Sequence, residues 1–294
     1  MNADAAGTVI TPAVLRGWPL PMPGDGKESR GHLLVVAGTV TTPGAARLAA
    51  EAALRAGAGK LTIATTAPAA ATLAVALPEA LVEPLPCGTD GSLSPGAADA
   101  VVRLARQADG LLVGPGFTDP EATVELLAGV LPRLDLPLVL DATASAYLGR
   151  RPTALRDHAG AAVLTVNPDE LALTAHRSRQ AVDADPAPVV AALAATAGVV
   201  VLCGGTEKHV ACPDGRAWVF QGGGPGLGVS GSGDVQAGIV AGLLARGAPA
   251  DQAAVWAGYL HGRTGERLAS EVGAVGFLAR ELLDQVPRIL VEIG

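Results

Sequence analysis

The stretch that decides the fold is "GPGLGVSGSGDVQAGIVAGLLARG", residues 224–247, in which a glycine-rich turn runs into an apolar helix. One carboxylate, Asp234, stands at the junction. Gly231, Ser232 and Gly233 precede it and can point successive backbone N–H groups at a phosphate, which the dipole of the helix also favours. A carboxylate beside that phosphate is placed to take the proton of an attacking hydroxyl. We therefore interpret residues 231–233 as an anion hole and Asp234 as a catalytic base.

The same glycines admit three other interpretations. A P-loop requires a Lys-Ser/Thr pair after its last glycine, and the stretch has none. Gly226, Gly228 and Gly231 satisfy the G-x-G-x-x-G pattern of a dinucleotide fingerprint, with an acidic residue, Asp251, further on. Asp251, however, follows a helix and Pro249, so we expect it to be a helix N-cap and not a ribose ligand. In the third interpretation, the glycines only permit turns and tight helix packing. This last interpretation is the alternative to an anion hole.

The composition suits a large α/β protein with an aliphatic core. Hydrophobic residues make up 49% of the 294 residues and aromatic residues only 3%, so the core must consist of closely packed Ala, Val and Leu. The net charge is −7 and no basic run is present, which argues against a nucleic-acid partner.

Three features bear on the compartment. Cys87, Cys203 and Cys212 form neither a C-x-x-C motif nor an even set, which fits a reducing environment. The N-terminal stretch "MNADAAGTVI" lacks the basic and apolar regions of a signal peptide. The longest apolar run, near residues 189–203, is too short to span a membrane. We expect a soluble, cytoplasmic protein.

Strand-like and helix-like runs alternate along the chain. Nearly continuous apolar strands with helices between them are typical of a parallel sheet covered on both faces. The expected strands are 32–38, 60–66, 110–114, 136–142, 161–166 and 198–205, and the expected helices include 44–56, 234–247, 251–269 and 275–286. A β-hairpin is expected in 209–221, around the turn Pro213-Asp214-Gly215. Because no linker or low-complexity tract interrupts the chain, we expect a single domain over residues 1–294.

Four of the expected strands run into loops of small and polar residues. These loops read "AGTVTTPGA", "VGPGFTDP", "LDATAS" and "TVNPDE". In open parallel sheets, the ligand lies beyond the carboxyl ends of the strands. We therefore expect the four loops to share one cleft.

Several blocks resemble the ribokinase-like superfamily and, within it, the ADP/ATP-dependent NAD(P)H-hydrate dehydratases. The C-terminal block 226–269 carries the most specific part of this resemblance. The other blocks fall in family order: "TPAVL" (11–15), "VVAGTVTTPGAARLAAEAALRAGAGKLTIATT" (35–66), "LPEAL" (77–81), "GLLVGPGF" (110–117) and "VLDA" (139–142). The resemblance implies a three-layer α/β/α fold with a mainly parallel central sheet. It also implies an enzyme that phosphorylates the hydroxyl of the hydrated nicotinamide cofactor and then eliminates phosphate.

The resemblance also implies roles for individual residues. Asp234 matches the catalytic aspartate, and Gly231, Ser232 and Gly233 match the anion hole. Contacts to the hydrated cofactor are implied for Asp234 and for Ala45, Gly116, Asp141 and Asn167. Contacts to the nucleotide are implied for Gly204, Thr206, Lys208 and Gly233.

Asn167 and Glu170 fit the N-x-x-E pattern with which ribokinase-like kinases organise Mg²⁺ and phosphate through water. A hard cation prefers such oxygen ligands and keeps its waters. The alternative is a helix start, with Asn167 as N-cap, Pro168 at the first position and Glu170 at the third. The two interpretations are compatible.

The chain departs from the family pattern at several positions. The missing lysine at the nucleotide-side strand end removes a cation near the phosphates, and the loop that follows contains Lys208. The replaced histidine affects the substrate contacts. The departures are Asn167-Pro168-Asp169-Glu170 for His-Pro-Gly-Glu, Cys203-Gly204 for Lys-Gly, Asp141-Ala142-Thr143 for Asp-x-Asp, and Gly224 for Asn.

The remaining candidates have simple structural interpretations. Asp141 either lines the cleft or is a solvated loop carboxylate. Cys203 is expected to be a small buried residue, because no histidine partner stands near it in sequence. His261, inside a helical run, is expected to be a hydrogen-bonded structural histidine. The other histidines, His32, His158, His176 and His209, lack metal-ligand spacing.

The leading hypothesis is an ADP- or ATP-dependent NAD(P)H-hydrate dehydratase that uses Mg²⁺, has no fused epimerase domain and, by resemblance, forms a homotetramer. The first alternative is a small-molecule kinase of the same fold, of the hydroxymethylpyrimidine or hydroxyethylthiazole type. The second is a nucleotide-binding paralogue without catalysis. The choices between ADP and ATP, and between NADH-hydrate and NADPH-hydrate, stay open.

Overall fold

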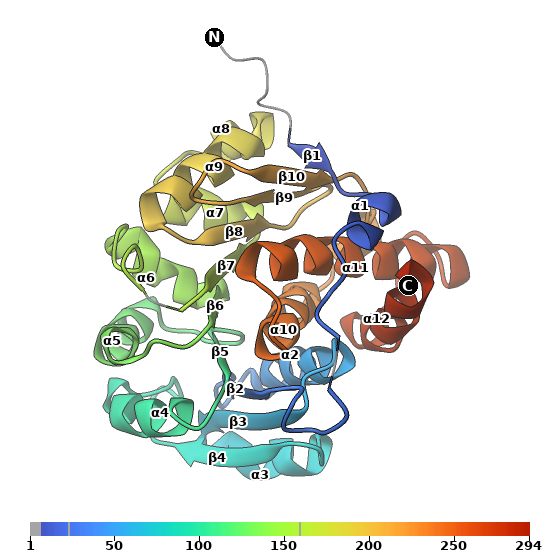
Figure 1. Ribbon diagram of the computed structural model, residues 1–294. Helices are drawn as coiled ribbons and strands as arrows, with labels where there is room; N and C mark the ends of the chain where they lie inside the picture. The colour runs from blue at the N-terminus through green and yellow to red at the C-terminus, as the bar shows by residue number, and fades with distance from the viewer. Residues whose placement is uncertain (1–6, 23, 159) are drawn as a thin grey trace.

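A ten-stranded, mainly parallel sheet runs through the residues that the structure describes, 7–22, 24–158 and 160–294 of this computed structural model (Figure 1). The strand order is β1-β10-β9-β8-β7-β6-β5-β2-β3-β4. The strands are β1 (Thr8–Val9), β2 (His32–Val36), β3 (Lys60–Thr66), β4 (Leu81–Leu85), β5 (Gly110–Val113), β6 (Leu138–Asp141), β7 (Ala162–Val166), β8 (Val200–Cys203), β9 (Lys208–Ala211) and β10 (Ala217–Phe220). Strands β2 to β8 pair in parallel, whereas β9 is antiparallel to both neighbours.

The strands predicted from continuous apolar runs are confirmed, and so is the hairpin formed by β9 and β10. Strands β5 to β8 are buried along their whole length, because helices cover both faces of the sheet. Two edge strands, β1 and β4, were not expected. Strand β4 has an exposed Leu81 and contains Pro84, so neither a buried run nor a clean alternation marks it in the sequence.

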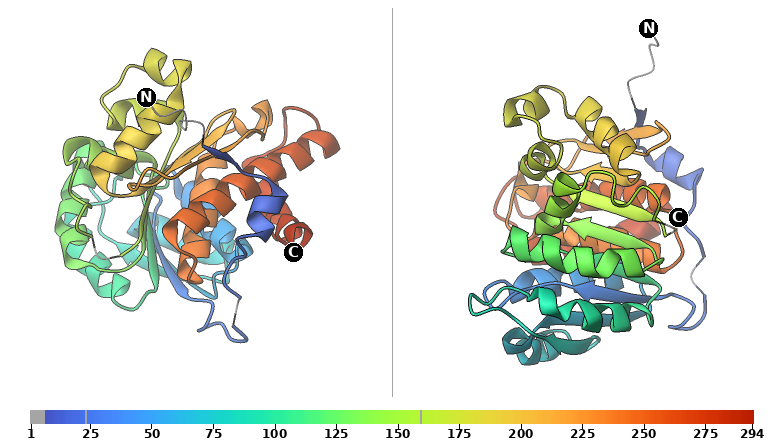
Figure 2. Two further views of the ribbon diagram at one scale, coloured as in Figure 1. Left: turned by 45° about the horizontal axis from the view of Figure 1, so that its top comes forward. Right: turned by 90° about the vertical axis from the view of Figure 1, so that its left-hand side faces the viewer.

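Helices form a layer on each face of the sheet, so the predicted three-layer α/β/α arrangement is confirmed. Helices α2, α10, α11 and α12 lie on one face, and α4, α5, α6, α7 and α9 lie on the other (Figures 1 and 2). The helices are α1 (Pro12–Arg16), α2 (Pro43–Arg55), α3 (Ala67–Ala76), α4 (Ala98–Ala105), α5 (Pro120–Val130), α6 (Ser145–Arg150), α7 (Pro168–Thr174), α8 (Arg179–Ala184), α9 (Pro186–Ala197), α10 (Ser232–Ala245), α11 (Ala250–Glu271) and α12 (Ala279–Ile293).

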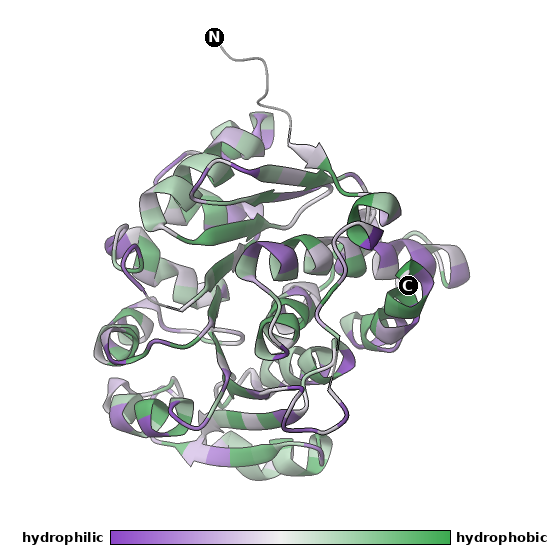
Figure 3. Ribbon diagram, in the orientation of Figure 1, coloured by the Kyte–Doolittle hydropathy of each residue, from purple (hydrophilic) through white to green (hydrophobic). Residues whose placement is uncertain are grey.

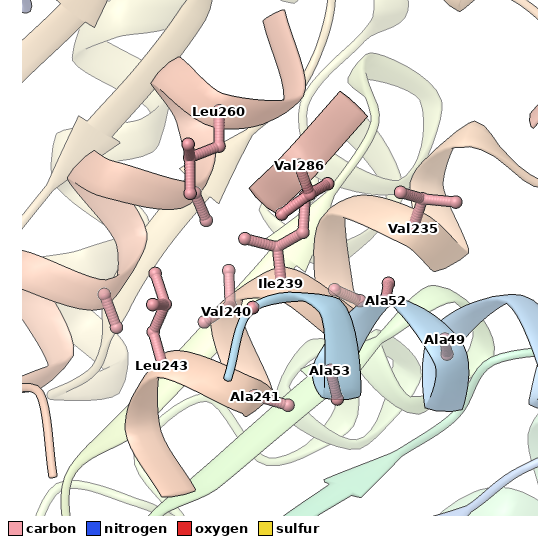
Figure 4. Packing of buried hydrophobic residues seen from close by; sticks show 14 of the residues in the cluster. Ala49, Ala52, Ala53, Val235, Ile239, Val240, Ala241, Leu243, Leu260 and Val286 are labelled. Carbon is pink, nitrogen blue, oxygen red and sulfur yellow. The ribbon is translucent and has the colours of Figure 1, made fainter. Parts of the chain in front are cut away.

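Helix α10 is the central element of its layer. It is apolar on all sides and buried along nearly its whole length, as is expected of a helix enclosed by the sheet and by other helices (Figure 3). It lies so close to α2 that a Cβ on Gly238 would be 2.2 Å from the carbonyl oxygen of Ala49, and one on Gly242 would be 2.4 Å from that of Ala53 (Figure 4). The packing interpretation of the glycines is therefore correct for these two residues.

Two helix boundaries differ from expectation. The N-cap of α11 is Pro249, and Asp251 lies inside the first turn, where its carboxylate accepts a hydrogen bond from the N–H of Gln252 and pairs with Arg216. The N-cap prediction for Asp251 was therefore wrong. Helix α12 runs past Pro287 to Ile293, because residues beyond the proline are buried against the core. None of the described helices is long and apolar enough to cross a membrane.

Candidate functional site

A cavity of about 1170 Å³ opens where β6, β7 and β8 end and α10 begins. These strands are parallel, so their carboxyl ends meet at one edge of the sheet, where the turn before α10 also lies. Of the four loops expected to share one cleft, "LDATAS" after β6 and "TVNPDE" after β7 line this cavity, whereas "AGTVTTPGA" and "VGPGFTDP" contribute none of its lining residues. The segment after β8, which was not among the four, lines it as well. The predicted site residues that line it are Asp141, Asn167, Glu170, Gly204, Thr206, Lys208, Gly231, Ser232, Gly233 and Asp234.

The turn before α10 presents free backbone donors to this cleft. Gly231 is the N-cap of the helix and has a φ of +91°, a left-handed conformation that glycine adopts without strain. The backbone N–H groups of Gly233 and Asp234 have no acceptor among the described residues, as is usual in a first helical turn. A Cβ placed on Gly233 would meet no atom within 4 Å, so its backbone borders open space. The geometry is that of an anion site.

Asp234 stands in the first turn of α10, beside these donors. Burial, the larger cause, and the negative charge of Glu170 together raise the pKa of its carboxyl to about 6. A carboxylate with a pKa near neutrality is both available as a base and a better proton acceptor than an ordinary aspartate. Its position and chemistry therefore suit deprotonation of a hydroxyl.

Asn167 and Glu170 form a capping box at the start of α7. The Asn167 side-chain oxygen accepts hydrogen bonds from the N–H groups of Asp169 and Glu170, both at 2.9 Å. The Glu170 carboxylate accepts one from the N–H of Asn167 at 2.8 Å. The helix-start interpretation is therefore confirmed, and the Asn167 side-chain oxygen is already used by backbone donors. Burial raises the pKa of Glu170.

Asp141 is the last residue of β6 and is only 5% exposed, so the solvated-loop alternative was wrong. It accepts a hydrogen bond of 2.6 Å from the Thr165 hydroxyl of the neighbouring strand β7. Burial raises the pKa of Asp141 well above its ordinary value, and the charges of Asp234 and Glu170 add to the effect. The cleft thus gathers three carboxyl groups from three elements.

These carboxyl groups do not form a complete metal site. Among the described residues, no group of three or more His, Cys, Asp or Glu side chains is arranged to hold a metal ion. Mg²⁺ typically keeps several waters and binds to proteins through one or two carboxylates together with the phosphates of a substrate. Glu170 and Asp234, which repel each other across the cleft, fit that mode of binding.

The residues predicted to contact the nucleotide on this side of the cleft lie beyond β8. The N–H of Gly204 donates to the carbonyl of Val166 at 2.8 Å and so continues the pairing of β7 with β8. Thr206 is exposed in the loop, whereas Lys208, at the start of β9, is 1% exposed. Cys203 is buried as expected, and burial raises the pKa of its thiol to about 12.

Ala45 and Gly116 do not line the cavity but lie next to each other beside it. A Cβ on Gly116 would be 2.8 Å from the Cβ of Ala45, and the Thr42 hydroxyl donates to the Gly116 carbonyl at 2.5 Å. Leu48, one turn further along α2, would be 2.5 Å from a Cβ on Gly231. We call the turn formed by Gly231, Ser232 and Gly233 the anion turn. The pair therefore lies on the side of the anion turn that faces α2.

Sequence reasoning missed two residues of the cleft, His261 and Gln236. His261, on α11, is buried and its Nε2 is 2.9 Å from the hydroxyl of Ser232. It is hydrogen-bonded as expected, but its partner belongs to the anion turn. Gln236 lies on α10, and a lone amide in an otherwise apolar helix is the signal that marks it.

The comparisons with known sequences agree on one family. The family model described as NAD(P)H-hydrate dehydratase matches residues 33–288. The ADP-dependent (S)-NAD(P)H-hydrate dehydratase of Xanthomonas campestris pv. campestris is 44% identical over 288 residues, which cover 96% of this chain and 95% of that protein. The chain spans about half the length of the bifunctional NAD(P)H-hydrate repair enzymes. It is 36% identical to that of Moorella thermoacetica over 88% of this chain and 49% of that protein.

Solved structures give the same result. The ADP/ATP-dependent NAD(P)H-hydrate dehydratase from Bacillus subtilis, co-crystallised with ATP and Mg²⁺, matches with a TM-score of 0.86 and 29% identity over 98% of this chain and 99% of that one. A ribokinase-like superfamily protein from Enterococcus faecalis matches with a TM-score of 0.83 and 21% identity over 100% of this chain and 98% of that one, which confirms the predicted ribokinase-like fold. The chain belongs to the NAD(P)H-hydrate dehydratase family.

Proposed function

We propose that this protein is an ADP- or ATP-dependent NAD(P)H-hydrate dehydratase, which restores NAD(P)H from its hydrated form. The observation that carries the proposal is the position of Asp234. It stands beside the free N–H groups that begin α10, faces a cleft large enough for two ligands, and has a pKa of about 6. This combination suits phosphoryl transfer to a hydroxyl.

Asp234 accepts the proton of the substrate hydroxyl as the hydroxyl oxygen attacks the terminal phosphorus of the nucleotide. The bond between that phosphorus and its bridging oxygen breaks, and the shortened nucleotide leaves. The free N–H groups of Gly233 and Asp234 stabilise charge on the transferred group. In the second step the C–O bond of the phosphate ester breaks, the neighbouring carbon loses a proton, and the ring double bond is restored.

The two ligands are proposed to occupy different parts of the cleft and to meet at Asp234. Gly204, Thr206, Lys208 and Gly233 are proposed to contact the nucleotide. Asp141, Asn167, Ala45 and Gly116 are proposed to contact the hydrated cofactor, with Ala45 and Gly116 at its edge. Mg²⁺, when bound, offsets charge on the nucleotide phosphates, and Glu170 would hold it through water.

The family resemblance supports three further proposals. The chain acts as a single domain, as a homotetramer, and in the cytoplasm. The two core clusters on opposite faces of one continuous sheet support the first. Light scattering of the purified protein tests the second, since the tetramer and the 29.2 kDa monomer differ fourfold in mass.

The test is a reaction of the purified protein with hydrated NADH or NADPH, Mg²⁺ and either ADP or ATP. Absorbance at 340 nm reports the restored dihydronicotinamide, and a phosphate assay reports elimination. We expect both signals to rise together with at least one nucleotide. A stable phosphorylated product without a rise at 340 nm would instead identify a small-molecule kinase. Neither signal from folded, nucleotide-binding protein would identify a paralogue without catalysis.

A further inference from the structure

Lys208 is a buried lysine without a counter-ion. It is 1% exposed, and no ion pair among the described residues includes it, whereas the half-buried Lys60 pairs with Glu28. Its aliphatic stem packs against α11, since a Cβ on Gly258 would be 3.9 Å from both Cβ and Cδ of Lys208. A buried charge is costly unless something pairs with it. Lys208 also lines the cleft.

Successive side chains of β9 lie on opposite faces of the sheet, so the strand register shows on which face Lys208 lies. Cys203 pairs with His209 and packs in the core on the α7–α9 side of the sheet. Lys208 pairs with Phe220, whose side chain packs in the core on the α10–α11 side. The two residues therefore face opposite layers. Lys208 does not occupy the place of a lysine at position 203, but it lies on the same side of the sheet as the anion turn.

Lys208 shares this position with the hydrogen-bonded pair of His261 and Ser232. His261 lies one helical turn after Gly258 on α11, and the charge of Lys208 helps to lower the pKa of its imidazole. The imidazole Nε2 is 2.9 Å from the hydroxyl of Ser232, in the first turn of α10. The row Lys208, His261, Ser232 thus leads from β9 to the free N–H groups of the anion turn.

Two buried polar atoms, one in this row and one beside it, have no partner among the described residues. They are Nδ1 of His261 and Oε1 of Gln236, on side chains that are both 4% exposed. Gln236 lies against the end of β8, where its amide nitrogen would be 3.6 Å from a Cβ on Gly204. Both side chains line the cleft. Buried polar groups without a partner are rare in folded proteins. Nδ1 of His261 can donate to an anion when it carries the imidazole proton, whereas Oε1 of Gln236 is an acceptor and needs a donor as its partner.

We propose that Lys208, Gln236 and the Ser232–His261 pair form the phosphate-binding end of the nucleotide subsite, with Lys208 as the cation that holds the phosphates of a nucleoside diphosphate or triphosphate. This chain therefore supplies that cation from β9, on the α10–α11 side of the sheet. The neutral His261 holds the Ser232 hydroxyl in place, and the side-chain N–H of Gln236, not its unpaired Oε1, donates to a phosphate oxygen. The identity of the ligand rests on the proposed function.

The charge balance agrees with this assignment. Burial lowers the pKa of Lys208 to about 8, and a negative charge on Cys203 would act in the opposite direction. A polyphosphate beside the ammonium group would favour its charged form and remove the cost of burying it. The nucleotide thus supplies the counter-ion that the described residues do not.

Calorimetric titrations with ADP and with adenosine, both with Mg²⁺, test the proposal on wild type and Lys208→Met. Lys60→Met is the matched control, because it removes a lysine from the opposite end of the sheet. We expect Lys208→Met to bind ADP at least tenfold more weakly than wild type and to bind adenosine within twofold of it. Lys60→Met should behave as wild type with both ligands. Unchanged ADP affinity in Lys208→Met, or an equal loss for ADP and adenosine, would overturn the proposal.

A second measurement uses the wild-type protein, so it tests the proposal even if Lys208→Met fails to fold. The chain has three lysines, Lys27, Lys60 and Lys208, so acylation of each amine can be followed by mass spectrometry. We expect saturating ADP, but not adenosine, to slow acylation of Lys208 at least fivefold and to leave Lys27 and Lys60 unaffected. Equal acylation of Lys208 with and without ADP contradicts the assignment. If ADP binds as expected but no NADH is restored, the proposed function fails and this subsite stands.

Discussion

At the scale of single residues, the cleft gathers three carboxyl groups where the proposed reaction needs a base. Asp141, Glu170 and Asp234 each have a raised pKa, and burial is the largest cause in all three. Such an arrangement costs stability, because the charged forms would be better solvated in the unfolded chain. It also keeps Asp234 as a base that titrates near neutral pH.

The first prediction concerns the stability cost of Asp234. Its pKa is about 6 in the folded protein against about 3.9 in an unfolded chain. The folded state therefore binds the proton more tightly, and stability falls as pH rises from about 4 to about 6. Above pH 6 the full cost is present, so Asp234→Asn should stabilise the protein by roughly 1–3 kcal/mol at pH 7.5. Urea unfolding measures this difference in the free energy of unfolding. An Asp234→Asn variant that is less stable than wild type at pH 7.5 would contradict the raised pKa of Asp234.

The second prediction uses the same pKa for catalysis. Asp234 must be ionised to accept a proton, so kcat/KM should fall about tenfold for each pH unit below about 6. The measurement is the pH profile of kcat/KM at constant ionic strength, over a range in which circular dichroism shows the protein to be folded. A profile that stays flat down to pH 5 would exclude Asp234 as the base.

The third prediction separates an anion hole from a mere packing role at Gly233. A Cβ there would meet nothing within 4 Å, so Gly233→Ala should fold with a Tm within about 2 °C of wild type. The added methyl group would stand where the phosphate must approach, and kcat/KM should fall at least tenfold. The control is Gly44→Ala in α2, where a Cβ also meets nothing within 4 Å. Full activity of Gly233→Ala would support packing alone.

At the scale of elements, the contact between α2 and α10 fixes the start of α10. Gly238 and Gly242 let the two helices approach so closely that backbone meets backbone. The anion turn is the direct continuation of α10 at its N-terminal end, so any displacement of the helix moves the donors as well.

The fourth prediction follows from this contact. Alanine normally favours a helix interior over glycine by about 1 kcal/mol. At Gly238 the sign should reverse, because the new Cβ would be 2.2 Å from the carbonyl oxygen of Ala49. We expect Gly238→Ala to lose about 2–4 kcal/mol in urea unfolding and to lose activity. Gly44→Ala, which has open space, should gain up to about 1 kcal/mol. A stabilised Gly238→Ala would show that the two helices are not in this contact.

The sequence predicts the inner elements of this fold well and the outer ones poorly. Strands β5 to β8 are apolar throughout because both faces are covered, so their residues alone identify them. Strands β1 and β4 lie at the edges of the sheet, where half-exposed residues carry no such pattern. In the site, Asp234 and the glycines form one local motif. The contact of Ser232 with His261 joins residues 29 positions apart, and no local pattern announces it.

At the scale of the whole molecule, the cleft needs ligands to complete it. Its carboxylates come from three elements, yet no group of three His, Cys, Asp or Glu side chains among the described residues is arranged to hold a metal ion. The described chain thus lacks a complete metal site of its own, which suits an ion that arrives with the nucleotide.

The fifth prediction tests this dependence. Chelation with EDTA should abolish activity and leave the Tm of the free protein unchanged, because the metal does not stabilise the fold by itself. ADP at a hundredfold excess over its Kd should stabilise the protein by about 2.7 kcal/mol when Mg²⁺ is present, and by less after chelation. Differential scanning calorimetry measures both effects. A Tm that drops with EDTA in the absence of nucleotide would indicate a structural metal.

The most direct test of the account is the rise of absorbance at 340 nm with hydrated NADH, ADP or ATP, and Mg²⁺. Three proteins are compared: wild type, Asp234→Asn, and Asp99→Asn as a control that removes a carboxylate paired with Arg133 on the surface. We predict that wild type and Asp99→Asn restore NADH at equal rates, and that Asp234→Asn binds the nucleotide but is at least 100-fold slower. An Asp234→Asn variant that restores NADH at the wild-type rate would contradict the account.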